Sequence, residues 1–384
     1  MAGLVLLALV LAVALYRTDD REVITPPAPS PGQTRSPADL TRADGAAQLL
    51  LDLTEALDDG SRAEVLSLAA PGEPIARKAL ATIHANVSAL GVDDISLRFV
   101  DEEAGGVPPA LGRELGESAW VGDVVLGWRL RGFDPGPSSL ETSLVFVDTP
   151  DGVAFGAPDD DETAPLWLLE RLAVARSGRA LVATTDQRQL GRYARLADHA
   201  VRDVRSVLPR WRGRLVVEVP ASREQLDQVL GAEPGTYTAI AAVTATVDGS
   251  TRRSAPVHIL VNPDVFAELG SDGSQIVMSH EATHVAMRAA TSTMPLWLLE
   301  GFADYVALAR ADLPVEVTAS QILERVRRTG PPRTLPRGRD FDPSNKILGT
   351  SYEAAWLASR LLAEVYGERG LVRFYDTVDA GAST

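Results

Sequence analysis

The residues from His280 to Tyr305, HEATHVAMRAATSTMPLWLLEGFADY, decide how the rest of the chain is interpreted. The segment SQIVMSHEATHVAMRAAT predicts one helix, and a break at Met294-Pro295 follows it. Proline suits the first turn of a helix, so LWLLEGFADYVALA is predicted to form a second helix directly after the break. The sequence therefore predicts two consecutive helices joined by a short turn.

The first of these helices carries two histidines at metal-ligand spacing. His280 and His284 are four residues apart, so both imidazoles project from one face and can reach one metal ion. Glu281 lies between them and flanks the open coordination position, which completes the HExxH pattern. The chain has only 5 histidines, so this pattern rarely arises by chance. An ordinary helix with structural histidines remains the alternative.

The second helix offers a third ligand. Glu300 lies 16 residues after His284 (300 − 284), close enough for an antiparallel helix to return it to the histidines. Two His and one Glu leave a fourth position for water, as in catalytic zinc sites. Asp304, one turn further on the same face, can accept the remaining ring N–H of a ligand histidine. Each acid alone could be a surface residue, but the apolar surroundings favour the metal interpretation.

Together, HEATH and WLLEGFADY resemble the gluzincin branch of zinc metallopeptidases, the thermolysin-like clan, and in particular its bacterial peptidase-MA-like members. The resemblance covers roughly residues 186–384. It implies that Glu281 is the general base, that Asp304 supports a ligand histidine, and that a zinc-bound water hydrolyses a peptide or protein substrate. It also implies one Zn²⁺ per chain, held by His280, His284 and Glu300.

The residue that stabilises the oxyanion is less clearly marked. Peptide hydrolysis needs a donor besides zinc at the tetrahedral oxyanion. The thermolysin type uses a downstream histidine there, and this chain has none after His284. Family members show a tyrosine ahead of an apolar helix with a YG ending, which matches Tyr352. A packing role for Tyr352 stays open, and the other candidates are Tyr305, Tyr366 and Arg360.

The strand APVHILVNP, residues 255–263, is similar in placement to the edge strand that pairs with an extended substrate in these enzymes. His258 lies on this strand, and we interpret it as a strand side chain rather than a ligand. Members of the family usually continue past a helix like RFYDTV into another helical segment. This sequence stops at DAGAST, so we expect a C-terminal truncation.

The N-terminus predicts export. An unbroken apolar run from Gly3 to Tyr16 indicates a secretory signal or membrane anchor over residues 1–17, although a spanning helix needs roughly 20 residues. A buried core helix is the alternative. Residues 18–37 are rich in Pro and Ser and predict an extended linker. We therefore expect an extracytoplasmic protein that is secreted or anchored in a membrane through its N-terminal apolar segment.

Two globular domains are predicted, and the fold class is α+β. Helical patterns followed by strand-like segments indicate an N-terminal domain over residues 38–185, which includes the strands ERLAVAR (170–176) and RALVATT (179–185). The order of its elements resembles small cone-shaped domains of the NTF2-like kind. Residues 186–384 are predicted to form a mixed sheet followed by a mainly helical region of the gluzincin type.

Composition narrows the possible functions. The 384 residues, 45% of them hydrophobic, suffice for two or three domains with cores of their own. Fifty-two acidic and 37 basic residues give a net charge of −15, which argues against nucleic acid as a partner. The absence of cysteine excludes disulfides and thiolate zinc sites.

Two readings compete with a peptidase. One is a non-catalytic extracytoplasmic binding protein whose metal site is regulatory or decayed, and the other is a structural cell-envelope protein. A decayed site usually loses its general base first, and Glu281 is present.

Overall fold

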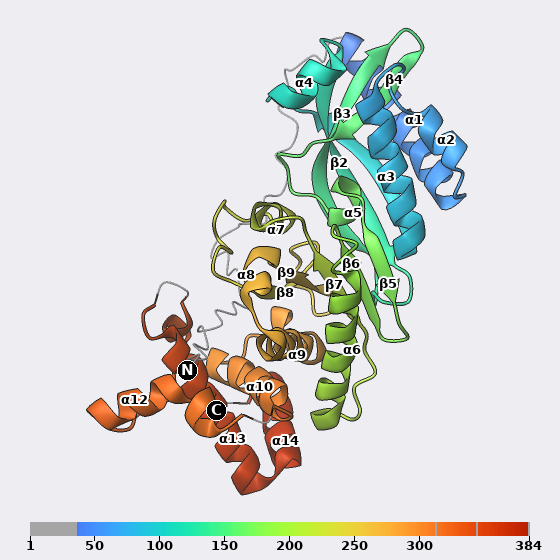
Figure 1. Ribbon diagram of the computed structural model, residues 1–384. Helices are drawn as coiled ribbons and strands as arrows, with labels where there is room; N and C mark the ends of the chain where they lie inside the picture. The colour runs from blue at the N-terminus through green and yellow to red at the C-terminus, as the bar shows by residue number, and fades with distance from the viewer. Residues whose placement is uncertain (1–36, 312, 343–344, 383–384) are drawn as a thin grey trace. The chain divides into compact units, whose positions relative to one another are not determined.

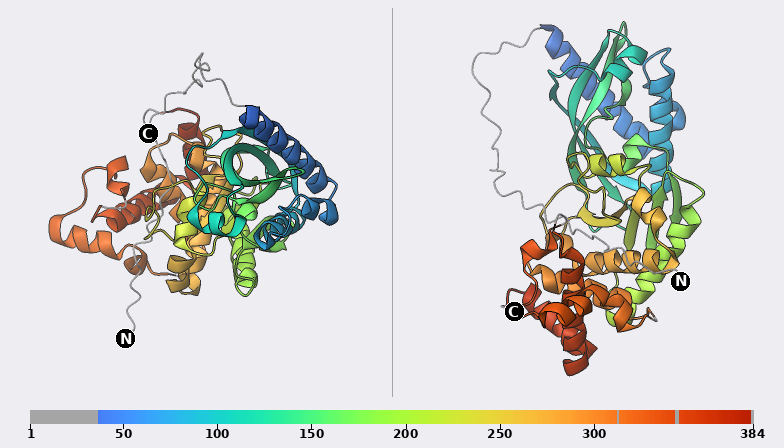
Figure 2. Two further views of the ribbon diagram at one scale, coloured as in Figure 1. Left: turned by 90° about the horizontal axis from the view of Figure 1, so that it is seen from above. Right: turned by 60° about the vertical axis from the view of Figure 1, so that its left-hand side comes forward.

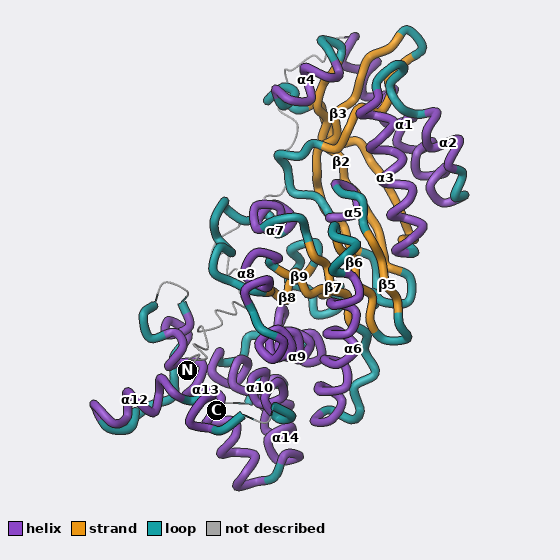
Figure 3. The backbone as a smooth tube through the Cα atoms, in the orientation of Figure 1, coloured by secondary structure: helices purple, strands orange, loops and turns teal. Residues whose placement is uncertain are grey.

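The computed structural model describes residues 37–311, 313–342 and 345–382. The predicted signal or anchor at 1–17 and the predicted linker up to residue 36 lie outside the described residues, so both stay predictions. Helices and strands follow one another along the chain (Figures 1 and 3), which confirms the predicted α+β class. Among the helices in the described ranges, none combines the length and apolar character that a bilayer-spanning helix requires.

The described residues form two compact units. One comprises residues 37–172 and 228–232, and the other comprises the described residues from 173 to 227 and from 233 onward. The main division therefore falls between residues 172 and 173, ahead of the boundary at 185 that the strand pattern suggests.

The first unit packs helices against a four-stranded antiparallel sheet of order β1-β2-β3-β4. Its strands are β1 (Val92–Glu102), β2 (Ala119–Leu130), β3 (Ser138–Thr149) and β4 (Gly152–Pro158). Its helices are α1 (Pro37–Asp58), α2 (Arg62–Ser67), α3 (Pro74–Leu90), α4 (Pro109–Leu115) and α5 (Leu166–Leu169). Proline opens α3, and Gly91 ends it with a left-handed φ of 62°. Trp120 and Phe146 lie opposite each other in register and stack with ring centroids 4.8 Å apart.

The second unit contains a five-stranded mixed sheet of order β5-β6-β7-β9-β8. Strands β6, β7 and β9 are parallel, whereas the two outer strands β5 and β8 run antiparallel to their neighbours. The strands are β5 (Ala173–Arg176), β6 (Ala180–Thr184), β7 (Leu215–Val219), β8 (Ala242–Thr246) and β9 (Val257–Val261).

The helices of this part of the chain follow the predicted order, and the described residues after β9 contain helices and no strands. They are α6 (Leu190–Val207), α7 (Arg223–Val229), α8 (Pro263–Glu268), α9 (Ser271–Met287), α10 (Leu296–Leu308), α11 (Val315–Thr318), α12 (Ser320–Thr329), α13 (Leu348–Tyr366) and α14 (Glu368–Asp379). Short 3₁₀ helices, η1 (Ala289–Thr291) and η2 (Gly338–Phe341), lie between them.

Strands β5 and β6 belong to a different sheet from the one that the sequence pattern predicts. The sequence groups ERLAVAR and RALVATT with the first domain, but β6 pairs in parallel with β7 and so joins the second sheet. All five residues of β6 are buried, as is usual for a parallel strand covered on both faces. Such an apolar run has no alternation that would reveal its partner, so local pattern could not assign it.

The prediction that residues 255–263 form the substrate-pairing edge strand is also wrong. This stretch contains β9 (Val257–Val261), which lies between β7 and β8 and therefore has no free edge. The edge strand on this side is β8. His258 is a buried side chain of β9 whose Nδ1 lies 2.5 Å from Oε1 of Glu218 on β7. Its role as a strand side chain agrees with the sequence interpretation.

Three helices pack closely in the core of the second unit. Helix α10 packs against both α9 and α13 (Figures 1 and 2). Gly301 on α10 permits the contact with α13, because a Cβ there would lie 2.3 Å from the carbonyl oxygen of Ala355 and 2.8 Å from Oγ of Ser359. Leu298 and Phe302 on the same helix are fully buried and belong to the hydrophobic core of this unit, as does Ala355.

The close approach at Gly301 predicts that Gly301→Ala destabilises the fold by about 1–3 kcal/mol. Alanine raises helix propensity by about 1 kcal/mol, but the clash is with the backbone of a neighbouring helix and outweighs that gain. Chemical unfolding of the full chain measures the change.

The control is Gly191→Ala on α6, where the nearest atom to the new Cβ is Nη1 of Arg195 at 3.5 Å. This variant should be at least as stable as the parent. Equal stability of both variants would show that α10 and α13 do not approach so closely.

Candidate metal centre

Helix α9 presents both histidines of the HExxH pattern to one buried site. It runs through His280 and His284 and ends at Arg288, which has the left-handed φ of 56°. The two imidazole rings lie one turn apart, with centroids separated by 4.5 Å and planes inclined at 78°. Arg288 ends α9 and leads directly into η1, and α10 then begins after Pro295. The turn thus brings the second helix back across the first.

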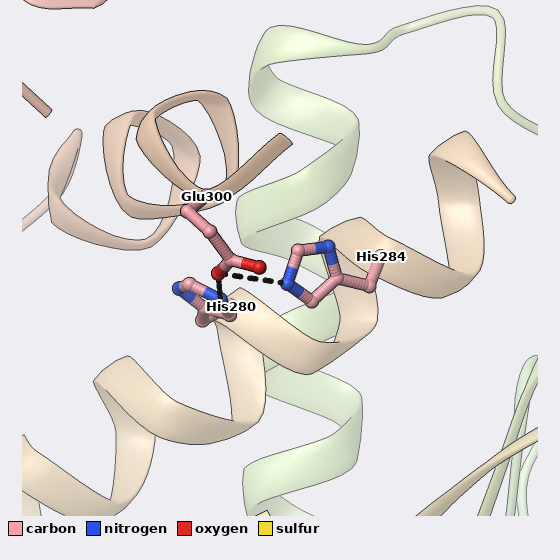
Figure 4. A group of neighbouring side chains, drawn as sticks. All are labelled: His280, His284 and Glu300. Carbon is pink, nitrogen blue, oxygen red and sulfur yellow. Dashed lines mark hydrogen bonds and ion pairs between the residues drawn. The ribbon is translucent and has the colours of Figure 1, made fainter. Parts of the chain in front are cut away.

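Helix α10 delivers Glu300 to the two imidazoles (Figure 4). Its Oε2 atom lies 3.2 Å from Nε2 of His280 and 3.4 Å from Nε2 of His284. The exposed fractions of the three residues are 0%, 1% and 2% for His280, His284 and Glu300. The structure therefore brings together the three ligands that the sequence predicts.

These three side chains fit a metal ion. One ligand atom from each residue lies within 4.8 Å of the others. The Nε2 atom of His284 is buried, and among the described residues it makes no hydrogen bond of good geometry, only the 3.4 Å ion-pair contact with Glu300, so it can still serve as a ligand. Two imidazoles and one carboxylate form a donor set that suits zinc and several other divalent transition metals. The site can therefore bind a metal ion.

Asp304 lies beside this site, on the outer side of the His280 ring. Its Oδ1 atom is 2.7 Å from Nδ1 of His280. Because a carboxylate only accepts, Nδ1 carries the hydrogen and Nε2 is the nitrogen that faces Glu300. The structure therefore places Asp304 against the ring nitrogen of His280 that faces away from Glu300, which is the contact that the sequence predicts for it.

The pKa values of the triad reflect burial opposed by opposite charge. Burial disfavours the charged form of His280, but the carboxylates of Asp304 and Glu300 outweigh it and raise its pKa to about 10. Burial also disfavours the Glu300 carboxylate, and the two imidazoles outweigh this effect and lower its pKa to about 2. For His284 burial dominates and lowers the pKa. Glu300 is therefore the anion that two neighbouring imidazoles stabilise.

Glu281 points its carboxyl group toward the sheet. The Thr244 hydroxyl on β8 donates to its Oε2 atom at 2.5 Å, while its Oε1 atom is buried without a partner among the described residues. Burial raises the pKa of Glu281 to about 8. One oxygen of this carboxyl group is thus held, and the other remains available for a proton.

Tyr352 lies on α13, the helix that packs against α10. It is buried, and its ring meets Phe341 edge-on at 5.2 Å. Burial, followed by the negative charges of Glu300, Asp304 and Glu281, raises the pKa of Tyr352 well above its usual value. The charges of these three acids therefore act on its hydroxyl.

The other oxyanion candidates have different surroundings. The Tyr305 hydroxyl donates to Glu368 at 3.4 Å, and Arg360 pairs with Glu364 at 2.8 Å. Tyr366 is largely exposed at the end of α13. Among the predicted candidates, Tyr352 is the one whose pKa is raised by the charges of the three acids of the site.

Thr244 is the site residue that sequence reasoning missed. Strand β9 and helix α8 lie between it and the HExxH helix in the sequence, and a threonine in a strand is ordinary, so no local signal marks it.

A scan against protein-family models finds no match for this chain, and a search of curated proteins finds none either. The resemblance to gluzincins therefore rests on the two motifs and on the geometry of His280, His284 and Glu300.

The geometry predicts about one zinc ion per chain, and His284→Ala should lose most of it because one of three protein donors is gone. Elemental analysis after dialysis against a defined zinc concentration measures the content. His199→Ala removes an exposed histidine of α6 and should retain the metal. Equal zinc in both variants, or none in the parent chain, would contradict a site at the triad.

Proposed function

We propose that this protein is a zinc-dependent peptidase that acts on peptide or protein substrates outside the cytoplasm. The observation that carries the proposal is the buried carboxyl group of Glu281. It adjoins a His-His-Glu cluster and keeps one oxygen, Oε1, without a partner in the described residues. A purely structural metal site does not need a carboxyl group with an unpaired oxygen beside it, whereas hydrolysis requires a general base at this place.

Three residues would hold the metal, namely His280, His284 and Glu300, with Asp304 fixing the orientation of the His280 ring. When bound, a zinc ion supplies Lewis acidity, which polarises a carbonyl oxygen and lowers the pKa of water. Three protein donors leave room for a substrate or water, as catalytic sites require.

Glu281 would then act as the general base. Its Oε1 atom is the position that accepts the proton of the attacking water, because Oε2 is already bonded to Thr244. The same oxygen can return the proton to the leaving amine, as microscopic reversibility of the proton path allows. Burial excludes bulk water that would compete for this proton.

Strand β8 would bind the substrate backbone, in the manner that the resemblance implies for an edge strand. The backbone N–H of Asn262 donates to the Ala241 carbonyl, and the backbone N–H of Val247 donates to the Pro256 carbonyl, so residues 241 and 247 both face β9 with their backbone groups. In an antiparallel ladder every second residue does so, and the residues between them direct their N–H and C=O to the opposite side. Thr244 is one of these, so its backbone N–H and C=O point away from β9, toward an added strand.

Tyr352 would stabilise the oxyanion by donating its hydroxyl proton. Its raised pKa keeps this proton in place at neutral pH, which is what a donor needs. The extracytoplasmic location rests on the apolar segment of residues 3–16 and the Pro-rich stretch after it. The acidic net charge of −15 argues for peptide rather than nucleic-acid substrates.

Replacement of the base tests the proposed function directly. Glu281→Gln keeps the size of the side chain and should retain zinc while kcat on a peptide library falls by about 10²–10⁴, the contribution of a general base. Cleavage by the parent chain should disappear with a chelator and return with added zinc. A zinc-loaded, folded parent chain that cleaves no peptide would contradict the proposal and favour a binding protein.

Tyr352→Phe tests the oxyanion role separately. Removal of an oxyanion donor costs about 10²–10³ in kcat, and KM should change little. The matched control is Tyr375→Phe on α14, another buried tyrosine, whose ring lies 4.7 Å from that of Phe302. If Tyr352→Phe and Tyr375→Phe behave alike, Tyr352 is a packing residue.

A further inference from the structure

We propose that Thr244 is a positioning residue of the proposed peptidase: its hydroxyl fixes Glu281 so that Oε1 faces the reacting water. The same residue presents its backbone to the substrate strand. This inference rests on the proposed function, and it assigns to an edge-strand side chain a role that neither HExxH nor the ligand set requires.

The contact between Thr244 and Glu281 is buried and short. The exposed fraction of Thr244 is 0% and that of Glu281 is 1%. Oγ1 of Thr244 lies 2.5 Å from Oε2 of Glu281 and 3.2 Å from the Glu281 carbonyl oxygen. A hydroxyl has one proton, so the shorter contact to the carboxyl group takes it. Because both groups are buried, loss of this bond would leave Oε2 without a partner.

This bond restricts the terminal torsion of the Glu281 side chain. The terminal torsion of a glutamate is broad, so its two oxygens exchange roles at little cost. A β-branched threonine has few rotamers, and its position on β8 is set by the ladder to β9. Thr244 therefore holds Oε2 in place. Oε1 is left as the oxygen that can accept a proton.

The position of Thr244 also connects the carboxyl group with the substrate. Its hydroxyl points toward α9, while its backbone N–H and C=O point away from β9, as the phase of the ladder requires. An extended peptide added to β8 would therefore pair with the residue that orients Glu281. The scissile bond and the base are placed relative to one rigid residue.

A purely structural bond between β8 and α9 is the competing explanation, and three variants separate the two. Thr244→Val has nearly the same shape but no hydroxyl, and Thr244→Ser restores the hydroxyl. Thr283→Val is the matched control on α9, because Thr283 is 1% exposed and its hydroxyl donates to the Ser279 carbonyl of the same helix at 2.8 Å.

In the zinc-loaded full chain, Thr244→Val should lower kcat by about 10- to 100-fold, the usual effect of losing a supporting hydrogen bond at a metal site. KM and zinc content should stay unchanged, since the backbone of β8 and the ligands are intact. Thr244→Ser and Thr283→Val should remain close to the parent chain. If Thr244→Val does not fold, Thr244→Ala replaces it.

Crystal structures of the same variants supply a readout that does not depend on activity. The carboxyl group of Glu281 should adopt one conformation in the parent and in Thr244→Ser, and a turned or mixed conformation in Thr244→Val. An unchanged Glu281 conformation in Thr244→Val overturns the proposal, as does an unchanged kcat or an equal loss in Thr283→Val. A parent chain without peptidase activity refutes the proposed function, while the crystal structures still decide whether Thr244 orients Glu281.

Discussion

The Glu300 carboxylate lies between two imidazoles inside an apolar core, and the surrounding helices depend on this arrangement. Burying a carboxylate costs several kcal/mol unless partners stay within bonding distance. Those partners, His280 and His284, lie 3.2 and 3.4 Å away on a different helix. Helices α9 and α10 must therefore keep a fixed relative position. Gly301, next to Glu300, allows α13 to close on α10 and so supports this position from the other side.

The sheet adds a second restraint on the same helix. Thr244 on β8 bonds Glu281, which lies between the two histidines in the sequence. The triad is thus assembled from helices, whereas the orientation of the proposed base depends on a strand. Thr244 belongs to the edge strand and also bonds the proposed base, so it would position both the extended substrate and the group that accepts the proton. This arrangement links the mixed sheet to the proposed chemistry.

The fold was only partly predictable from local pattern. The helices α9 and α10 were predicted because proline and the helical spacing of residues mark them. The sequence pattern places strands β5 and β6 in the wrong sheet, because β6 is buried on both faces and its pairing with β7 depends on a partner distant in sequence. The pattern also predicts β9 rather than β8 as the edge strand, for the same reason. Strand order depends on contacts between distant segments, which periodicity does not report.

The sequence by itself determined the donor set, since HExxH spacing, a Glu on the following helix and the absence of cysteine leave few other ligands. Helical geometry is local, so residues four apart share a face wherever the helix lies. Tertiary structure alone decided that Glu300 reaches both imidazoles, that Asp304 bonds His280, and that Thr244 holds Glu281. These contacts join separate elements, and only the packing of a common core brings such elements within hydrogen-bonding distance.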